Sequence, residues 1–300
     1  MDVVDAPKKK KHAYLVMVHR DVEQVCSLLR ALDHPLNDVY LHADLKFEEA
    51  SFESFVPYLS KAQLHFFQVK SIGWGTYDQF DIELSLVEWA LQEGGYSYYH
   101  LLSGQDFPLK KQDDIHSYFE GRDEEFIHFA RPEEWDRVVR ERVAVARYPR
   151  LMRRSSKGYA LEKCLSSIQR TMGINRLYAD TRYGFGGAWF SVTDQFARDF
   201  VKHRSWFQER FSRALCVDEH AIQSFALTFG YEKKLHRPIG DGSYESCLRY
   251  VDWSLGGSSP RTLHGDDFLR LVDSPYLFAR KFEAKESPAL LKLLKGEEID

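Results

Sequence analysis

The alternation of apolar runs with amphipathic segments in the first hundred residues most constrains the fold. Residues 13–18 (AYLVMV) form a nearly continuous apolar run, which is typical of a strand buried on both faces. Residues 21–33 then place five aliphatic side chains at helical spacing, and residues 38–43 (DVYLHA) predict a second strand. Two parallel strands joined by a helix through a right-handed crossover are the natural solution.

The same alternation continues along the chain. It predicts strands at 63–69, 98–102, 125–129 and 189–192, and helices at about 77–92, after the N-cap Thr193, at about 218–229 and between Ser287 and Gly296. The arginine-rich region 131–182 predicts helices and loops that lie over the sheet. We therefore expect a leader at 1–11 and one α/β domain at 12–300, with a Rossmann-like, mostly parallel central sheet flanked by helices.

Composition and charge exclude several function classes. The net charge of −4 provides no global basic field, so a nucleic-acid partner is not expected. The four cysteines form no C-x-x-C pair, which argues against a disulfide framework or a zinc ribbon and favours reduced thiols in a cytoplasmic protein. No apolar run approaches the ~20 residues of a membrane span. The run Lys8–Lys11 is interpreted as a solvated leader, with weak peripheral contact to an anionic membrane surface as the minority interpretation.

Polar residues follow four of the predicted strands. They are His19, Asp44, the Gly73-Trp74-Gly75 turn and Asp106. Ligands of open α/β sheets bind at the carboxyl ends of the strands, so these residues predict a pocket there. The alternative interpretation is that each is an ordinary loop residue, and that Trp74 is a core aromatic rather than a ring that stacks on a flat ligand.

The common nucleotide and metal motifs are missing. The sequence contains no G-x-x-x-x-G-K-[ST], and the glycines at 184, 186 and 187 do not have the spacing of the dinucleotide fingerprint. It also contains no D-x-D triplet to hold a divalent metal against a sugar-nucleotide diphosphate. We therefore expect no cofactor and no metal, and a bound diphosphate must be met by arginine, lysine or helix N-termini.

Two segments offer candidates for such chemistry. Glu219, in Val217-Asp218-Glu219-His220, is a possible catalytic acid, although a carboxylate in a first helical turn is also favoured by the helix dipole alone. Arg261 and Lys281 are candidate anion-binding cations, although both also fit an ordinary surface.

Motifs along most of the chain resemble one enzyme family. They are AYLVMVHRDVEQVCSLLRAL with VYLHADLK, SIGWGTYDQFDIELSLVEWAL, YYHLLSGQDFPLK, GGAWFSV, VDEHAIQSFAL, RYVDW, SPRTLHGDDF and LFARKF. In order and spacing they are similar to the core-2/I-branching β-1,6-N-acetylglucosaminyltransferases, glycosyltransferase family 14, which also includes the peptide O-xylosyltransferases. The resemblance covers residues 12–285 and is weakest at 131–182.

The resemblance implies a GT-A-like fold and an inverting, metal-independent transfer of N-acetylglucosamine or xylose from a UDP-sugar to a glycan hydroxyl. Glu219 matches the general base, and Arg261 and Lys281 match the cations that bind the diphosphate. The further matches are Val18, His19, Asp44, Trp74 and Asp106 on the donor side, and Trp189 and Trp253 on the acceptor side.

Departures from the family pattern concern the acceptor. Leu255 stands where the family has an acceptor-contacting tyrosine, and the arginine-rich stretch aligns poorly. In that stretch Glu133, Glu134, Arg137 and Arg140 are candidate acceptor contacts, or alternatively helix-surface ion pairs at i,i+4 spacing. The chain shows no anchor, stem or luminal disulfides, so it resembles a soluble bacterial member that acts in surface polysaccharide synthesis. We expect it in the cytoplasm or at the inner membrane face, with a glycan or lipid-linked glycan acceptor. Two other hypotheses stay open: a non-catalytic glycan- or nucleotide-binding protein on this fold, and, more weakly, a glycoside hydrolase.

Overall fold

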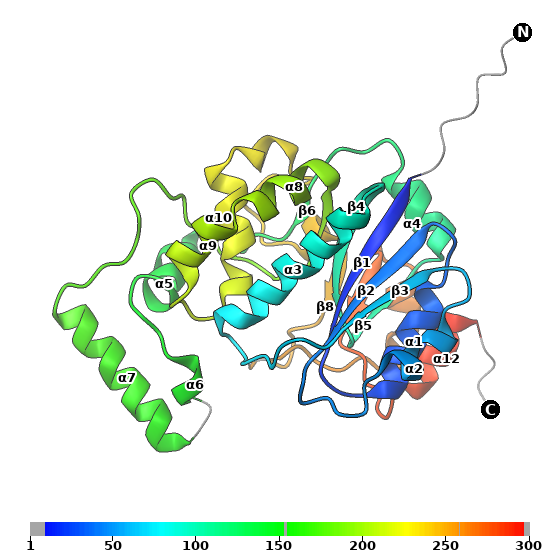
Figure 1. Ribbon diagram of the computed structural model, residues 1–300, viewed down its shortest axis with the longest axis horizontal. Coiled ribbons are helices and arrows are strands. Elements are labelled where there is room, and N and C mark those ends of the chain that lie inside the picture. Colours follow the sequence, from blue (N-terminus) through cyan, green and yellow to red (C-terminus); the bar gives the residue numbers. More distant parts are fainter. Residues whose placement is uncertain (1–9, 153–154, 258, 297–300) are drawn as a thin grey trace, which may run out of the picture.

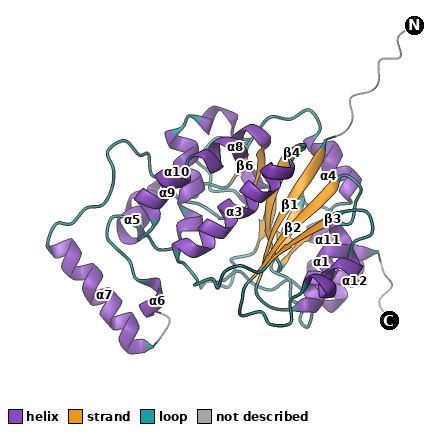
Figure 2. Cartoon of the chain, viewed as in Figure 1, coloured by secondary structure: helices purple, strands orange, loops and turns teal. Residues whose placement is uncertain are grey.

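The computed structural model describes residues 10–152, 155–257 and 259–296. Its centre is a six-stranded sheet with the strand order β3-β2-β1-β4-β7-β6, and the strands fan across the right half of Figure 2. The bounds are Lys11–Val18 (β1), Asn37–Ala43 (β2), Gln63–Phe67 (β3), Tyr96–Ser103 (β4), Phe126–Ile127 (β6) and Phe190–Thr193 (β7). The first four strands are parallel, and β7 is antiparallel to both β4 and β6. The predicted α/β class with a mostly parallel central sheet is confirmed.

A second, three-stranded sheet, with the order β5-β9-β8, was not predicted from the sequence. Its strands are Asp106–Pro108 (β5), Arg249–Val251 (β8) and Phe278–Arg280 (β9). In the register of β5 and β9, Asp106 is paired with Arg280. This small sheet therefore brings a C-terminal segment beside the carboxyl end of β4.

Helices cover both faces of the large sheet (Figure 1). The α-helices are Val22–Leu32 (α1), Phe52–Phe55 (α2), Tyr77–Glu93 (α3), Gln112–Phe119 (α4), Pro132–Arg142 (α5), Pro149–Met152 (α6), Ser156–Thr171 (α7), Asp194–Lys202 (α8), Arg204–Phe211 (α9), Ala221–Thr228 (α10), Phe268–Val272 (α11) and Pro288–Lys295 (α12). The 3-10 helices are Val56–Tyr58 (η1), Val217–Glu219 (η2), Tyr231–Lys234 (η3), Tyr244–Cys247 (η4) and Gly265–Asp267 (η5). Among the residues that the structure describes, no helix combines the length and the apolar character needed to cross a membrane.

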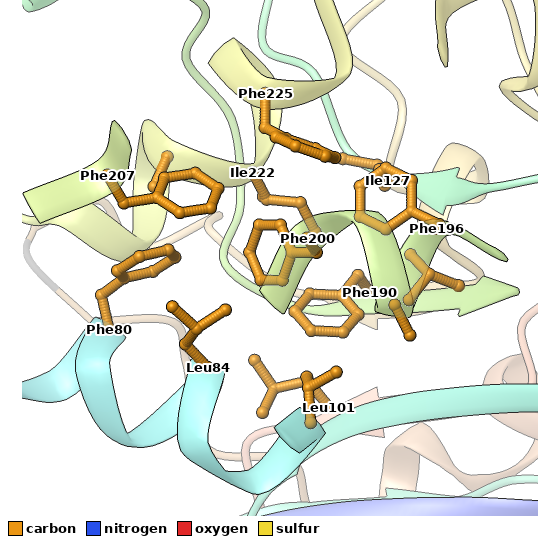
Figure 3. Close-up of a cluster of buried hydrophobic side chains, with 14 of the residues drawn as sticks. Phe80, Leu84, Leu101, Ile127, Phe190, Phe196, Phe200, Phe207, Ile222 and Phe225 are labelled. Carbon is orange, nitrogen blue, oxygen red and sulfur yellow. The ribbon is translucent and has the colours of Figure 1, made fainter. Parts of the chain in front are cut away.

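Alternate residues of β1 supply two separate cores. Ala13 and Leu15 join the core under α3, α8, α9 and α10, whereas Tyr14, Val16 and Val18 join the core under α1, α2 and α4. This division follows from the period of two in a strand. Figure 3 shows the aromatic centre of the first core, where Phe80, Phe200, Phe207 and Phe225 meet. Ring centroids there lie 4.8–5.7 Å apart, within the range of favourable edge-to-face packing.

Some predicted element ends differ from the structure. Thr193 caps α8 as predicted, because its hydroxyl accepts a hydrogen bond from the Phe196 amide. Ser287 does not cap α12 with its side chain, because its hydroxyl donates to the Leu263 carbonyl instead. Lys11 belongs to β1 rather than to a leader, and residues 1–9 of that predicted leader lie outside the described residues.

Candidate active site

Glu219 ends the 3-10 turn η2 in front of α10. The helix predicted from residue 218 begins only at Ala221, so Glu219 is not in the first turn of an α-helix. Its backbone is held from the other side, since the Gly186 amide donates to the Glu219 carbonyl at 3.0 Å. A Cβ on Gly186 would lie 2.0 Å from the His128 carbonyl oxygen, so only glycine permits this approach. The glycines that fail the dinucleotide fingerprint therefore position the candidate base.

The Glu219 carboxylate forms an ion pair with Arg142, from the end of α5. The Arg142 guanidinium also lies 5.4 Å from the centre of the Phe185 ring. The Glu219 side chain is 35% exposed and that of Arg142 is 27% exposed, so a substrate can reach both. Sequence reasoning missed Arg142, because nothing in the arginine-rich stretch distinguishes it from its neighbours.

Two more carboxyl groups lie behind Glu219. Gln79 of α3 donates to Asp218 at 2.8 Å and to Glu83 at 3.5 Å. Burial, and the negative charge of Glu219, raise the pKa of Asp218. Burial and the charge of Asp218 likewise raise the pKa of Glu83 well above its usual value. Glu219 is thus the accessible member of a carboxyl cluster whose other members favour the neutral form.

Arg280 lies at the end of β9, between Asp106 and Trp189. Its Nε is 3.5 Å from Asp106 Oδ1, and its guanidinium lies 4.3 Å from the centre of the Trp189 ring. Within the described residues, both that Nε and Asp106 Oδ1 lack a hydrogen-bond partner. The other Asp106 oxygen accepts from the Ser103 amide, and burial raises the pKa of the carboxyl group. Arg280 therefore has donor capacity left for an anion, which sequence reasoning did not assign to it.

Lys281 is adjacent to Arg280 and is mostly buried. Its ammonium group pairs with Glu283 at 2.6 Å, and Glu283 also accepts from Arg20 and Gln105. Burial alone would raise the pKa of Glu283, but these partners hold it below its usual value.

The first strands supply His19 and Asp44 near Lys281. Burial lowers the pKa of His19, the positive charges of Arg20, Arg280 and Lys281 lower it further, and Asp44 opposes them. The Asp44 amide donates to the Val18 carbonyl at 2.9 Å, and its carboxylate accepts from the amides of Lys46 and Ile72. The structure therefore brings together the predicted donor-side residues of β1, β2 and β9.

Trp74 lies beside these strand ends and is 48% exposed. It lines a hollow of about 640 Å³, whose walls are Lys46, Ser71, Ile72, Gly73, Thr76, Pro149 and Arg150. An aromatic ring exposed in a hollow favours the stacking interpretation over the core interpretation.

Arg261 is held differently from Arg280 and Lys281. Its guanidinium donates to Asp252 through Nε and Nη2, and to Asp267 through Nη1 and Nη2, at 2.7–3.0 Å. Those ion pairs raise the pKa of Arg261. The segments of Arg261 and Lys281 are neighbours, since the Leu263 amide donates to the Lys281 carbonyl. The predicted role of Arg261 at the diphosphate stays a prediction that requires these pairs to open.

The acceptor-side prediction centres on Trp253, which is 42% exposed. Its Nε1 donates to the Tyr244 hydroxyl at 3.1 Å, and the Tyr244 ring stacks on His128 with centroids 3.9 Å apart. Burial raises the pKa of Tyr244 to about 12, with a further contribution from Glu219 and an opposing one from Arg280. Tyr244 therefore lies within electrostatic reach of both the candidate base and the candidate cation. Sequence reasoning missed it.

The remaining predicted acceptor contacts lie on the surface of α5. Arg140 pairs with Asp136 and Arg137 with Glu141, both at i,i+4 spacing, and all four side chains are more than half exposed. Glu133 and Glu134 are exposed in the first turn. This arrangement favours the surface ion-pair interpretation.

No cluster of three or more His, Cys, Asp or Glu side chains able to hold a metal ion is found in residues 10–152, 155–257 and 259–296.

Comparison with known proteins supplies the family. Residues 12–270 match the family described as Core-2/I-Branching enzyme. Human N-acetyllactosaminide beta-1,6-N-acetylglucosaminyl-transferase is 27% identical over 94% of this chain and 71% of its own length. Rat xylosyltransferase 2 is 22% identical over 94% of this chain and 33% of its own length. The crystal structure of mouse xyloside xylosyltransferase 1 in its apo form aligns with a TM-score of 0.40 and 11% identity, covering 89% of this chain and 96% of that one, and we draw no argument from it. The chain belongs to the Core-2/I-branching enzyme family of glycosyltransferases.

Proposed function

We propose that this protein transfers N-acetylglucosamine or xylose from a UDP-sugar to a hydroxyl of a glycan acceptor, with inversion at the anomeric carbon. The observation that carries the proposal is that an accessible carboxylate, Glu219, and an arginine with free donor capacity, Arg280, both act on Tyr244. The two sugars are those that the names of the relatives contain.

In the proposed step, Glu219 removes the proton from the acceptor hydroxyl as its oxygen attacks the anomeric carbon. The bond between that carbon and the UDP oxygen breaks, and its electron pair leaves with UDP. A positioned general base contributes typically 10²–10⁴-fold to such a rate. Arg142 holds the carboxylate in place through the ion pair, and the Gly186 amide fixes the backbone of the same residue.

Arg280 and Lys281 are proposed to stabilise the negative charge that develops on the departing diphosphate. Both are mostly buried, which strengthens their interaction with an anion relative to a cation in open solvent. Two fixed cations can perform the charge stabilisation for which other transferases use a divalent metal, so we propose a metal-independent reaction. Asp44 and the hollow beside Trp74 are proposed to hold the uridine, and His19 and Val18 to line its approach.

The acceptor is proposed to bind where Trp253 and Tyr244 approach Glu219, with Trp189 behind Arg280. A glycan or a lipid-linked glycan of a bacterial surface polysaccharide would present suitable hydroxyls to this site. In such a pathway the protein would act in the cytoplasm, at the inner membrane face.

The proposed function is tested with Glu219→Gln, which keeps the shape of the side chain and removes its basicity. UDP-N-acetylglucosamine and UDP-xylose are first compared by thermal shift, because a ligand that binds only the folded state raises its stability. Turnover of the stabilising UDP-sugar is then followed by UDP release, with and without glycan acceptors and with EDTA. We expect Glu219→Gln to retain UDP affinity and lose at least 10²-fold in turnover. Glu49→Gln, an exposed carboxylate remote from the site, is the matched control. Near-normal turnover in Glu219→Gln would refute the role of the base, and loss of turnover in EDTA that manganese restores would refute metal independence.

A further inference from the structure

Helix α7 carries its amphipathic character in reverse. Its buried side chains are polar: Glu162 is 0% exposed and Ser166 is 2% exposed. Leu161, Ile168 and Met172, by contrast, are 51%, 49% and 70% exposed. Together with the half-buried Leu165, they fall at i, i+4, i+7 and i+11, which is one stripe along one face of a helix.

Polar contacts fix α7 in this orientation. Arg147 donates to both carboxylate oxygens of Glu162, at 2.5 and 3.1 Å, and Ser166 donates to Glu162 at 3.0 Å. Gln169 accepts from the Ala146 amide and donates to its carbonyl. The burial of Glu162 therefore depends on a paired, hydrogen-bonded geometry that keeps the apolar stripe outward.

The exposed apolar residues of the molecule concentrate in this segment. Of fourteen large hydrophobic side chains exposed in the described structure, six lie between residues 148 and 174, namely Tyr148, Tyr159, Leu161, Ile168, Met172 and Ile174. Figure 1 shows α7 at the far end of the molecule from the sheet. Soluble monomers rarely gather apolar side chains in this way unless the patch contacts a partner.

The same segment carries a charge opposite to that of the whole chain. Its described residues, 147–152 and 155–176, contain six lysine and arginine residues and one acid, whereas the chain has a net charge of −4. The single acid is Glu162, which is neutralised by Arg147. An exposed apolar stripe on a basic helix fits an anionic lipid surface, where aliphatic side chains enter the headgroup boundary and cations meet the phosphates.

We infer that the segment 147–176, centred on α7, docks on the surface of a membrane that contains anionic lipids. A nucleic acid or an acidic glycan would match the cations but would leave the aliphatic stripe exposed. A second copy of the chain would cover the stripe but would place two basic segments against each other.

Docking through α7 also orients the candidate active site. Pro149 and Arg150 of α6, which belong to the same segment, line the hollow beside Trp74. Arg150 in turn pairs with Asp78 at the start of α3. The hollow therefore lies next to the docking segment, and an acceptor carried by a lipid would be presented near it. The docking itself does not depend on the proposed transfer reaction.

The inference is tested by flotation of the full chain with vesicles of phosphatidylcholine alone or with about one quarter phosphatidylglycerol. We expect binding to the anionic vesicles, weaker binding at high salt, and little binding to phosphatidylcholine. The variant Leu161→Ser/Met172→Ser should bind the anionic vesicles on the order of tenfold more weakly. The matched control Phe52→Ser/Leu269→Ser removes two exposed apolar side chains elsewhere, 42% and 71% exposed, and should bind like the unmodified protein.

The alternatives give different results. A stripe variant with unchanged circular dichroism and unchanged vesicle binding would overturn the inference. So would loss of binding on replacement of Lys8 to Lys10 by glutamine while the stripe variant still binds. Light scattering that shows a dimer dissociated by the stripe substitutions, with no vesicle binding, would identify a second copy as the occupant. Retained turnover of soluble substrates in the stripe variant would show that a docking failure is separate from a failure of the proposed reaction.

Discussion

Arg261 and Arg280 should respond to alanine substitution in opposite ways. Arg261 is fully engaged by Asp252 and Asp267, which are 7% and 9% exposed, whereas Arg280 has only a 3.5 Å ion pair and a ring contact. Removing one partner of a buried ion pair costs 3–5 kcal/mol because a buried charge is left without compensation. Arg270 remains 2.5 Å from Asp267 in the Arg261→Ala variant, so we take the lower end, about 3 kcal/mol.

That cost converts into a measurable change in melting temperature. With an unfolding entropy of about 2.1 cal/mol/K per residue, a chain of 300 residues loses about 1.6 °C for each kcal/mol, so Arg261→Ala should melt about 5 °C lower. Arg280→Ala should change the melting temperature less. Because hydrogen bonds to charged groups contribute about 1.5–3 kcal/mol, it should instead weaken UDP affinity by about 10- to 100-fold.

Calorimetric titration with UDP and thermal denaturation are measured on both variants, with Arg261→Lys and Arg280→Lys as conservative controls. If Arg261→Ala keeps its melting temperature and loses UDP affinity, then its ion pairs open on binding and the reasoning above is wrong. The diphosphate role that the family resemblance implies for Arg261 would then be supported.

Two further predictions concern buried positions. Burial raises the pKa of Glu125 to about 7 from 4.5, despite its hydrogen bonds from Thr193. The folded state therefore binds the extra proton, and stability is lost as pH rises through 4.5 to 7, by about 3 kcal/mol in total. Glu125→Gln should be about as stable as the unmodified protein at pH 5 but more stable at pH 8 by urea denaturation; an equal difference at both pH values would contradict this. Gly186→Ala should lower stability by about 1–3 kcal/mol and displace Glu219, with a loss of turnover. Gly265→Ala is its control, since that Cβ would meet only Ala289 at 3.6 Å, and equal effects of the two substitutions would refute the argument.

The strands and helices around β1 could be predicted because each depends on the pattern of its own residues. An apolar run of six residues followed by an amphipathic stretch specifies β1 and α1 without any long-range information. The three-residue strands β5, β8 and β9 could not be predicted in this way. They are too short for a period to be recognised, and they form only because segments more than 140 residues apart pair with each other.

The candidate site shows the same limit. His19 and Asp44 were found because they directly follow predicted strands, and any parallel sheet brings such residues to one edge. Arg280 differs from Lys281 and Arg261 only in what surrounds it: Asp106 from β5, Trp189 before β7, and no competing carboxylate at bonding distance. None of these neighbours is within 90 positions of Arg280 in the sequence, so local pattern cannot distinguish a committed arginine from an available one. The availability of a cation for a ligand is thus a property of tertiary contacts, and the small sheet that creates those contacts determines which arginine can serve the diphosphate.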